Sequence, residues 1–190
     1  MQESLDIKEN TNIKKGQKGV KRKGRDNNIK IRIIRDTRET SPWDFEGSIP
    51  SKLDIVTIYD DTLDAGDYSI VGYDLPNDTC SIIIERKRSL EEFIGNIGKN
   101  WDRFQRELEK LSLYEYKYII IEDDLHNAYS RYKSSRTYFN MPPEFIISRI
   151  SDINIRYGVS THFLTQKYYA QRYALNLFKY VVTKDNSYDD

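Results

Sequence analysis

The sequence has little cysteine and no long apolar run. Cys80 is the single cysteine among 190 residues, so the chain cannot form an internal disulfide and gives no sign of an oxidising compartment. The longest apolar stretches are short, such as Ile82–Ile84, whereas a membrane helix needs roughly 18 apolar residues. The N-terminal segment lacks the apolar stretch of a secretory signal. We therefore expect an intracellular protein without a membrane span, in the nucleus, the cytoplasm or the nucleoid.

An excess of charge of one sign is also missing, but the overall balance hides an uneven distribution. The chain has 30 Lys and Arg against 30 Asp and Glu, while residues 1–28 carry eight basic and four acidic side chains. This segment has too few apolar residues to form a core, so we predict a basic disordered arm. Three interpretations stay open for the arm: a solvated tail, a phosphate-binding segment, or a nuclear localisation signal in Lys21, Arg22 and Lys23.

The rest of the chain is patterned as one domain, residues 29–183, followed by a polar tail, residues 184–190. Alternating and short apolar runs predict strands, and helical spacing of apolar residues predicts helices, one of them capped by Ser89 and another ended by Gly158. The predicted strands are 29–34, 53–59, 68–73, 80–87, 116–122 and 159–164, the third and fourth forming a hairpin, and the later helices cover 101–111, 143–157 and 166–182. We expect a three-layer α/β fold with a central mixed sheet flanked by helices.

The segment 127–141 combines hydroxyl, aromatic and basic residues and predicts a long loop. Its basic side chains are Arg131, Lys133 and Arg136. Basic and aromatic residues interleaved on a loop suit contact with phosphates and stacking on unpaired bases, so these three are candidate DNA-binding residues. A polar surface loop without a ligand explains the same composition.

The residues that could do chemistry cluster at the ends of the predicted strands. In Glu85-Arg86-Lys87, alternation puts Glu85 and Lys87 on one face of a strand and Arg86 on the other. Asp67 precedes Glu85 on the predicted hairpin, and a pair of carboxylates is a donor set that suits Mg²⁺. A lysine beside such a cation can orient an attacking water and stabilise charge on a phosphate. The pattern favours a phosphodiesterase site, although an ordinary surface ion pair also explains Glu-x-Lys alone.

Three motifs in order resemble the signature of XPF-type nucleases. They are Asp36-Thr37-Arg38-Glu39, Leu63-Asp64-Ala65-Gly66-Asp67-Tyr68 and Ile84-Glu85-Arg86-Lys87. They resemble the family pattern D-x-R-E, L-x-x-G-D-(Y/F) and (I/V)-E-R-K-x3-D. The resemblance covers roughly residues 29–182 and implies the restriction-endonuclease-like fold with its PD-(D/E)xK core.

The resemblance also implies roles for individual residues. Asp36, Asp67 and Glu85 would bind Mg²⁺ or Mn²⁺ and Lys87 would be the catalytic lysine, while Arg38, Glu39 and Arg86 would support the site or touch phosphate. The fourth acidic position departs from the pattern, because Glu91, with Glu92 beside it, stands where the family has aspartate. The tandem helix-hairpin-helix modules common in the family are not expected in this chain. A homodimer or heterodimer through the nuclease domain is implied.

These features predict a metal-dependent endonuclease acting on branched or distorted DNA in repair, recombination or replication. The alternative is a catalytically silent DNA-binding or scaffolding subunit of a nuclease dimer, and a third interpretation is a sequence-specific restriction-like enzyme. His126 and His162 lack metal-ligand spacing, and Cys80 has no nearby base, so we interpret all three as structural residues.

Overall fold

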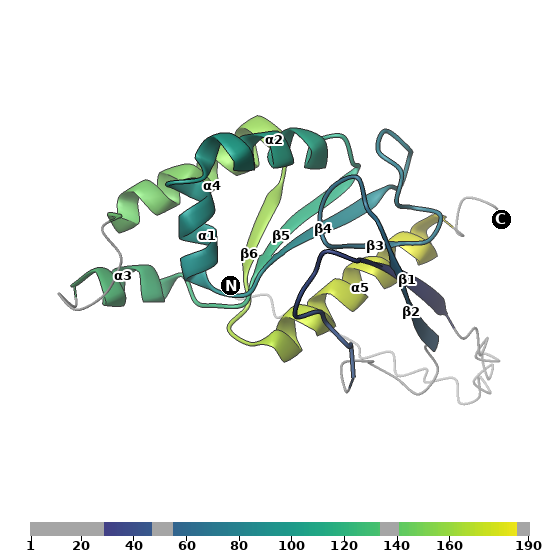
Figure 1. The fold of residues 1–190 in the computed structure, drawn as a ribbon. Coiled ribbons are helices and arrows are strands. Elements are labelled where there is room, and N and C mark those ends of the chain that lie inside the picture. The colour runs from purple at the N-terminus through teal and green to yellow at the C-terminus, as the bar shows by residue number, and fades with distance from the viewer. Residues whose placement is uncertain (1–28, 47–54, 134–140, 186–190) are drawn as a thin grey trace, which may run out of the picture.

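The computed structural model describes residues 29–46, 55–133 and 141–185. The predicted basic arm, with Lys21, Arg22 and Lys23, lies outside these residues, as does Arg136 of the predicted loop. The described chain builds a six-stranded sheet in the order β2-β1-β3-β4-β5-β6 (Figure 1). The strands are β1 (Lys30–Asp36), β2 (Ile55–Asp61), β3 (Tyr68–Ile70), β4 (Ile82–Lys87), β5 (Tyr116–Ile121) and β6 (Ser160–Phe163).

The sheet is mixed, as the sequence predicted. β3 pairs antiparallel with both β1 and β4, whereas β2 runs parallel to β1, and β5 and β6 continue parallel beyond β4. Tyr68 lies opposite Ile84, so the predicted hairpin is confirmed. The central strands β1, β3 and β4 are those that carry the three acidic motifs or directly follow them.

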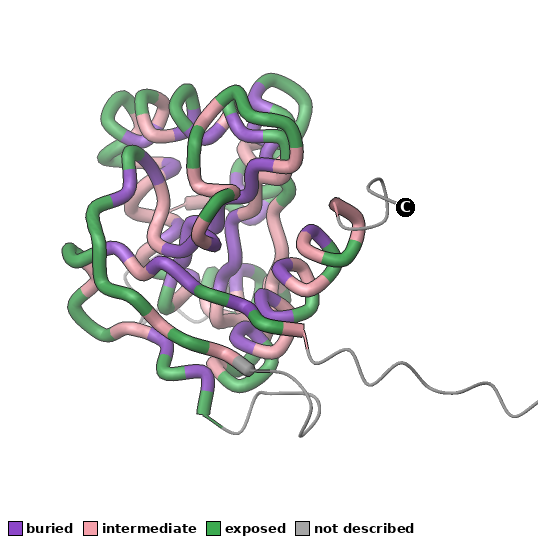
Figure 2. The backbone as a smooth tube through the Cα atoms, turned by 90° about the vertical axis from the view of Figure 1, so that its right-hand side faces the viewer, coloured by how far each residue is buried: buried purple, intermediate pink, exposed green. Residues whose placement is uncertain are grey.

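Helices cover both faces of the sheet and complete three layers (Figure 1). The helices are α1 (Leu90–Ile97), α2 (Trp101–Leu111), α3 (His126–Lys133), α4 (Pro143–Tyr157) and α5 (Lys167–Asp185). Successive side chains of β4 point to opposite faces of the sheet and join two hydrophobic cores. Ile83 packs with α1, α2 and α4, while Ile82 and Ile84 pack with α5. The buried positions run along the sheet between these layers (Figure 2).

Local signals explain where several helices begin and end. The Ser89 hydroxyl accepts a hydrogen bond from the Glu92 backbone N–H at 3.2 Å, which caps α1 as predicted. Gly158 adopts φ 64° directly after α4, a conformation that favours glycine. α5 continues to Asp185, past the predicted end at Val182, and its last turn is held by hydrogen bonds from Tyr73 to Asp185 (2.8 Å) and from Lys184 to Tyr116 (2.6 Å).

The prediction of a loop across 127–141 is wrong for its first half, which forms α3. This helix has a place in the fold because Ala128 is buried in the core beside α4. Residues 134–140 and the side chain of Lys133 lie outside the described residues. Within the described parts of the chain, none of the helices is both long enough and apolar enough to span a membrane.

Candidate active site

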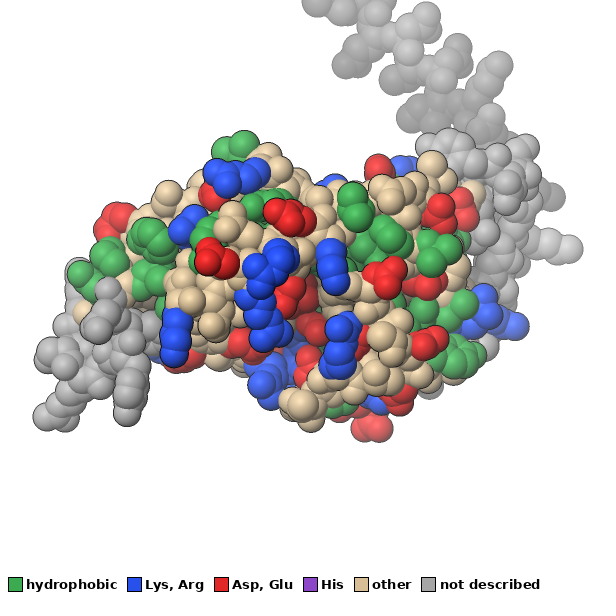
Figure 3. Space-filling model, turned by 45° about the horizontal axis from the view of Figure 1, so that its top comes forward, with side chains coloured by type: hydrophobic (Ala, Val, Ile, Leu, Met, Phe, Trp, Pro, Cys, Tyr) green, Lys and Arg blue, Asp and Glu red, His purple; other side chains and the backbone are tan. Residues whose placement is uncertain are grey.

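An open cleft of about 480 Å³ lies at the C-terminal ends of β1 and β4, beside the segment that precedes β3. Its walls include six of the residues predicted from the sequence: Asp36, Arg38, Glu39, Asp67, Glu85 and Lys87. Acidic side chains lie in the hollow, with basic side chains beside them (Figure 3). The fold therefore brings together three motifs that are separated by up to about fifty residues in the chain.

Backbone hydrogen bonds at Asp67 join the three motifs. The Asp36 N–H donates to the Asp67 carbonyl at 2.9 Å, and the Asp67 N–H donates to the Ile84 carbonyl at 2.8 Å. Gly66 makes this approach sterically feasible: its φ is +67°, and a Cβ there would lie 2.6 Å from Ile83 Cγ1. The glycine of the second motif is thus required to place Asp67 between the other two motifs.

Asp67 and Glu85 form an incompletely compensated carboxylate pair. Lys87 Nζ contacts Glu85 Oε1 at 2.5 Å, and Asp67 Oδ2 accepts a hydrogen bond from the Arg86 backbone N–H at 2.6 Å. Burial, followed by repulsion from Glu85, raises the pKa of Asp67 well above its usual range. Glu85 has the Lys87 ammonium in contact, whereas none of the ion pairs among the described residues includes Asp67, so the carboxylate pair is short of positive charge.

Lys87 stays protonated despite its burial. Burial on its own would lower the pKa of this ammonium, but the charge of Glu85, the hydrogen bond to Glu85 and the charge of Asp67 outweigh that effect and raise the pKa. Lys87 is therefore charged where it contacts Glu85, and its part in the chemistry stays a prediction.

Asp36 is buried, with 2% of its surface exposed, and both of its carboxylate oxygens are occupied. Oδ1 accepts from Arg38 N (2.8 Å) and Nε (2.7 Å), and Oδ2 accepts from Arg38 Nη2 (2.7 Å) and Leu63 N (2.9 Å). Burial would raise the pKa of Asp36, but these hydrogen bonds lower it. The geometry supports a role in orienting Arg38, and metal binding by Asp36 stays a prediction.

The donor chemistry of the cleft fits a hard divalent cation held by Asp67 and Glu85. Mg²⁺ binds carboxylate oxygens and retains several waters, so two carboxylates suffice. Among the described residues, no three Asp, Glu, His or Cys side chains form a ready ligand cluster, consistent with the engagement of Asp36 by Arg38. A cation between Asp67 and Glu85 would supply the missing positive charge.

The structure separates the two glutamates at the fourth acidic position. Glu92 lines the cleft, with Oε1 at 4.0 Å from Lys87 Nζ, because neighbouring helical residues point about 100° apart. Glu91, the residue predicted to support the site, instead forms an ion pair with Arg131 on α3. Arg131, a predicted DNA-binding residue, also lies 3.7 Å from Asp123. Its engagement with two carboxylates favours a structural role.

Arg86 points to the opposite face of β4, as alternation predicted, and is 4% exposed. Its guanidinium donates to both oxygens of Glu122 (2.8 and 3.0 Å) and lies 3.6 Å from Glu39. The Trp43 indole N–H also donates to Glu122, and Trp43 stacks on Tyr68 with ring centroids 4.5 Å apart. This buried network fixes β4 from behind the cleft. Sequence reasoning missed Trp43 and Glu122, because nothing local shows that residues 79 positions apart meet.

Sequence reasoning also missed the contribution of α2 to the cleft. Arg103, Glu107 and Lys110 line it, and none of these three was among the candidate site residues predicted from the sequence. Their i, i+4, i+7 spacing was the available signal. His162, in contrast, lies between Tyr118 and Tyr173 (ring centroids 5.8 and 4.9 Å away) and outside the cleft, and burial lowers its pKa.

The layered mixed sheet and the acidic cleft define a nuclease-type α/β domain. The ERCC4 domain family matches residues 35–177, and the chain belongs to this family. The prediction of an XPF-type nuclease domain is thereby confirmed.

Two solved structures support the fold. XPF from Aeropyrum pernix aligns with a TM-score of 0.55 and 21% identity, covering 81% of this chain and 65% of that one. XPF from Aeropyrum pernix in complex with DNA aligns with a TM-score of 0.57 and 22% identity, covering 82% and 66%. The chain thus spans just under two thirds of each of these structures. A comparison with curated protein sequences found no match.

Proposed function

We propose that the protein is a divalent-metal-dependent DNA endonuclease that hydrolyses phosphodiester bonds at branched or distorted DNA, in repair, recombination or replication. The observation that carries the proposal is the convergence of Asp67, Glu85 and Lys87 in one open cleft. Membership of the ERCC4 domain family supports it, and the related XPF structure contains DNA. DNA inside the cell, in the nucleus, the cytoplasm or the nucleoid, would be the substrate.

The residues of the cleft divide the chemical work. Asp67 and Glu85 would hold Mg²⁺ or Mn²⁺, which supplies a Lewis acid and lowers the pKa of a bound water. Lys87 is charged and fixed beside Glu85, so it can orient water or stabilise negative charge on a phosphate. Arg38, whose side chain is 65% exposed, is oriented by Asp36 and can donate to a phosphate oxygen.

The direct test is cleavage of a panel of flap, fork, junction and plain duplex DNA with Mg²⁺. Asp67→Asn should abolish cleavage, because it removes a carboxylate from the pair. Its stability to urea should be equal to or higher than that of the wild type, because the substitution removes a buried charge and its repulsion from Glu85, the two causes of the raised pKa of Asp67. Glu109→Gln is the matched control, since Glu109 is exposed on α2 outside the cleft. Unchanged cleavage by Asp67→Asn would contradict the proposed role.

The alternative, a catalytically silent subunit, differs in metal binding. The endonuclease proposal predicts calorimetric Mn²⁺ binding that disappears in both Asp67→Asn and Glu85→Gln, whereas a silent subunit should show no carboxylate-dependent binding. The presence of Asp67, Glu85 and Lys87 together favours the enzyme. Cleavage confined to one short sequence in plain duplex would instead favour a restriction-like enzyme.

Pairing with a second nuclease domain, either an identical copy or a different chain, is part of the proposal and rests on the family resemblance. Sedimentation of the full chain, alone and with branched DNA, would measure it. A monomer in both conditions would contradict the proposed dimer.

A further inference from the structure

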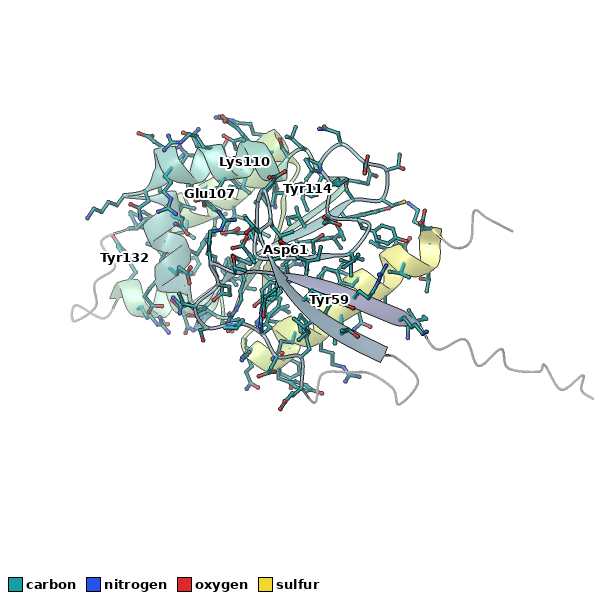
Figure 4. The ribbon with its side chains drawn as sticks, turned by 45° about the vertical axis from the view of Figure 1, so that its right-hand side comes forward. Tyr59, Asp61, Glu107, Lys110, Tyr114 and Tyr132 are labelled. Carbon is teal, nitrogen blue, oxygen red and sulfur yellow. The ribbon has the colours of Figure 1, made fainter. Side chains whose placement is uncertain are left out.

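Helix α2 is held in a fixed rotation beside the acidic cleft. Phe104, Leu108 and Leu111 are fully buried and anchor one side of the helix in the core. Arg103, Glu107 and Lys110 project from another side and line the cleft, whereas other charged residues of the same helix do not. Figure 4 labels Glu107 and Lys110 on α2. Three charged side chains on a rigid helix therefore form one rim of the cleft.

The charges of this rim differ in their engagement. Lys110 is exposed, and its ammonium contacts the Asp64 backbone carbonyl at 3.5 Å, with no carboxylate partner in the described part of the chain. Arg103 is 78% exposed and its Nε lies 3.1 Å from Glu107 Oε1, one helical turn away. Lys110 is thus available to an anion directly, and Arg103 would become fully available when the exposed, weak pair with Glu107 opens.

The acidic residues at the base of the cleft explain why basic side chains beside it would help DNA to bind. The carboxylates of Asp67 and Glu85 disfavour the approach of a polyanion, and basic side chains beside them would attract its phosphates. Arg103 and Lys110 are seven residues apart, which is about 10 Å along a helix axis. The two side chains leave the helix about two turns apart, so each can contact a phosphate of the same DNA backbone.

We propose that Arg103 and Lys110 form a phosphate-binding rim on α2, and that Glu107 restrains Arg103 until a DNA phosphate displaces it. This inference rests on the proposed function. In this arrangement α2 would position the DNA backbone along the cleft. The residues of β4 and of the segment before β3 would carry out the hydrolysis. Glu107 acts as an internal competitor of phosphate, so its removal should tighten DNA binding.

The test measures DNA affinity of the full chain against salt concentration, using a labelled branched duplex in EDTA so that no cleavage occurs. Arg103→Ala and Lys110→Ala should each weaken binding. Each should also reduce the steepness of log affinity against log salt concentration by about 0.9, the value for one lost phosphate contact. Arg106→Ala is the matched control, because Arg106 is exposed on α2 outside the cleft. It should keep the wild-type slope.

A second pair of variants tests the restraint with the opposite sign. Glu107→Gln should tighten DNA binding about twofold, the size of effect expected from freeing an i,i+4 pair, while Glu109→Gln should leave it unchanged. Wild-type slopes in both Arg103→Ala and Lys110→Ala, or an equal loss in Arg106→Ala, would overturn the inference while leaving the proposed function in place. Failure of the wild-type chain to bind DNA would also overturn the inference, whereas failure to cleave the branched DNA panel with Mg²⁺ would overturn the proposed function.

Discussion

Replacing Gly66 with alanine tests how the fold places Asp67. The new Cβ would lie 2.6 Å from Ile83 Cγ1 and 3.0 Å from the Ile84 carbonyl oxygen, in a residue with φ +67°. The left-handed conformation costs an L-residue about 1–2 kcal/mol, and overpacking a buried site costs about 1–3 kcal/mol. We therefore expect Gly66→Ala to lower the free energy of unfolding by about 2–5 kcal/mol.

Two other glycines separate these contributions. Gly72 has φ +90° with nothing within 4 Å of an added Cβ, so Gly72→Ala should show only the conformational cost of about 1–2 kcal/mol. Gly95 lies within α1 and also has open space, so Gly95→Ala should stabilise the protein by about 0.5–1 kcal/mol. Equilibrium urea unfolding of all three variants measures the differences.

Gly66 also connects the stability of the fold to the geometry of the site. A backbone shift at position 66 would move the Asp67 N–H and carbonyl that join Ile84 and Asp36. Under conditions where Gly66→Ala is still folded, its Mn²⁺ affinity should fall, whereas Gly72→Ala should bind like the wild type. A Gly66→Ala variant no less stable than Gly72→Ala would refute the argument that close packing against β4 requires glycine here.

Three further perturbations probe the rest of the structure. Glu122→Ala leaves Arg86 buried without its main partner and should cost about 3–5 kcal/mol in urea unfolding; a loss below 1 kcal/mol would contradict the role of the network. Ser89→Ala removes the cap of α1 and should cost about 1 kcal/mol, measured against Ser112→Ala, which lies at the C-terminal end of α2. Burial lowers the pKa of His162, so below about pH 6.5 the unfolded chain takes up a proton that the folded chain resists, and stability falls as the pH decreases through that range. His162→Gln should lose less stability than the wild type between pH 7.5 and 5.5, and equal losses would show that another group is responsible.

Much of the fold follows from local patterns that sequence alone exposes. The alternation in β1, the turn before β4 and the cap at Ser89 each act over a few residues, and the structure contains each predicted element near its expected position. Glu85 and Lys87 were predicted to share a face because a strand alternates side chains, and Lys87 contacts Glu85 at 2.5 Å.

The parts that could not be predicted depend on distant packing. The composition of segment 127–141 predicts a loop, yet Ala128 fits the core and residues 127–133 belong to helix α3. The choice between Glu91 and Glu92 depends on the rotation of α1, which its packing against the core sets. Glu122 gains its role through Arg86 and Trp43, which approach it from other elements.

The two faces of β4 lie under different constraints. Glu85 and Lys87 neutralise each other in the cleft, so replacing both with apolar residues of similar volume would leave folding nearly unaffected. Arg86 has no such freedom, because it also contacts Glu39 and its partner Glu122 also accepts from Trp43, so replacing Arg86 and Glu122 together would still leave other buried groups without partners. A duplicated copy of this domain that no longer cuts DNA would therefore lose Glu85 and Lys87 early during divergence, while Arg86, Glu122 and Trp43 would be retained for as long as the copy folds.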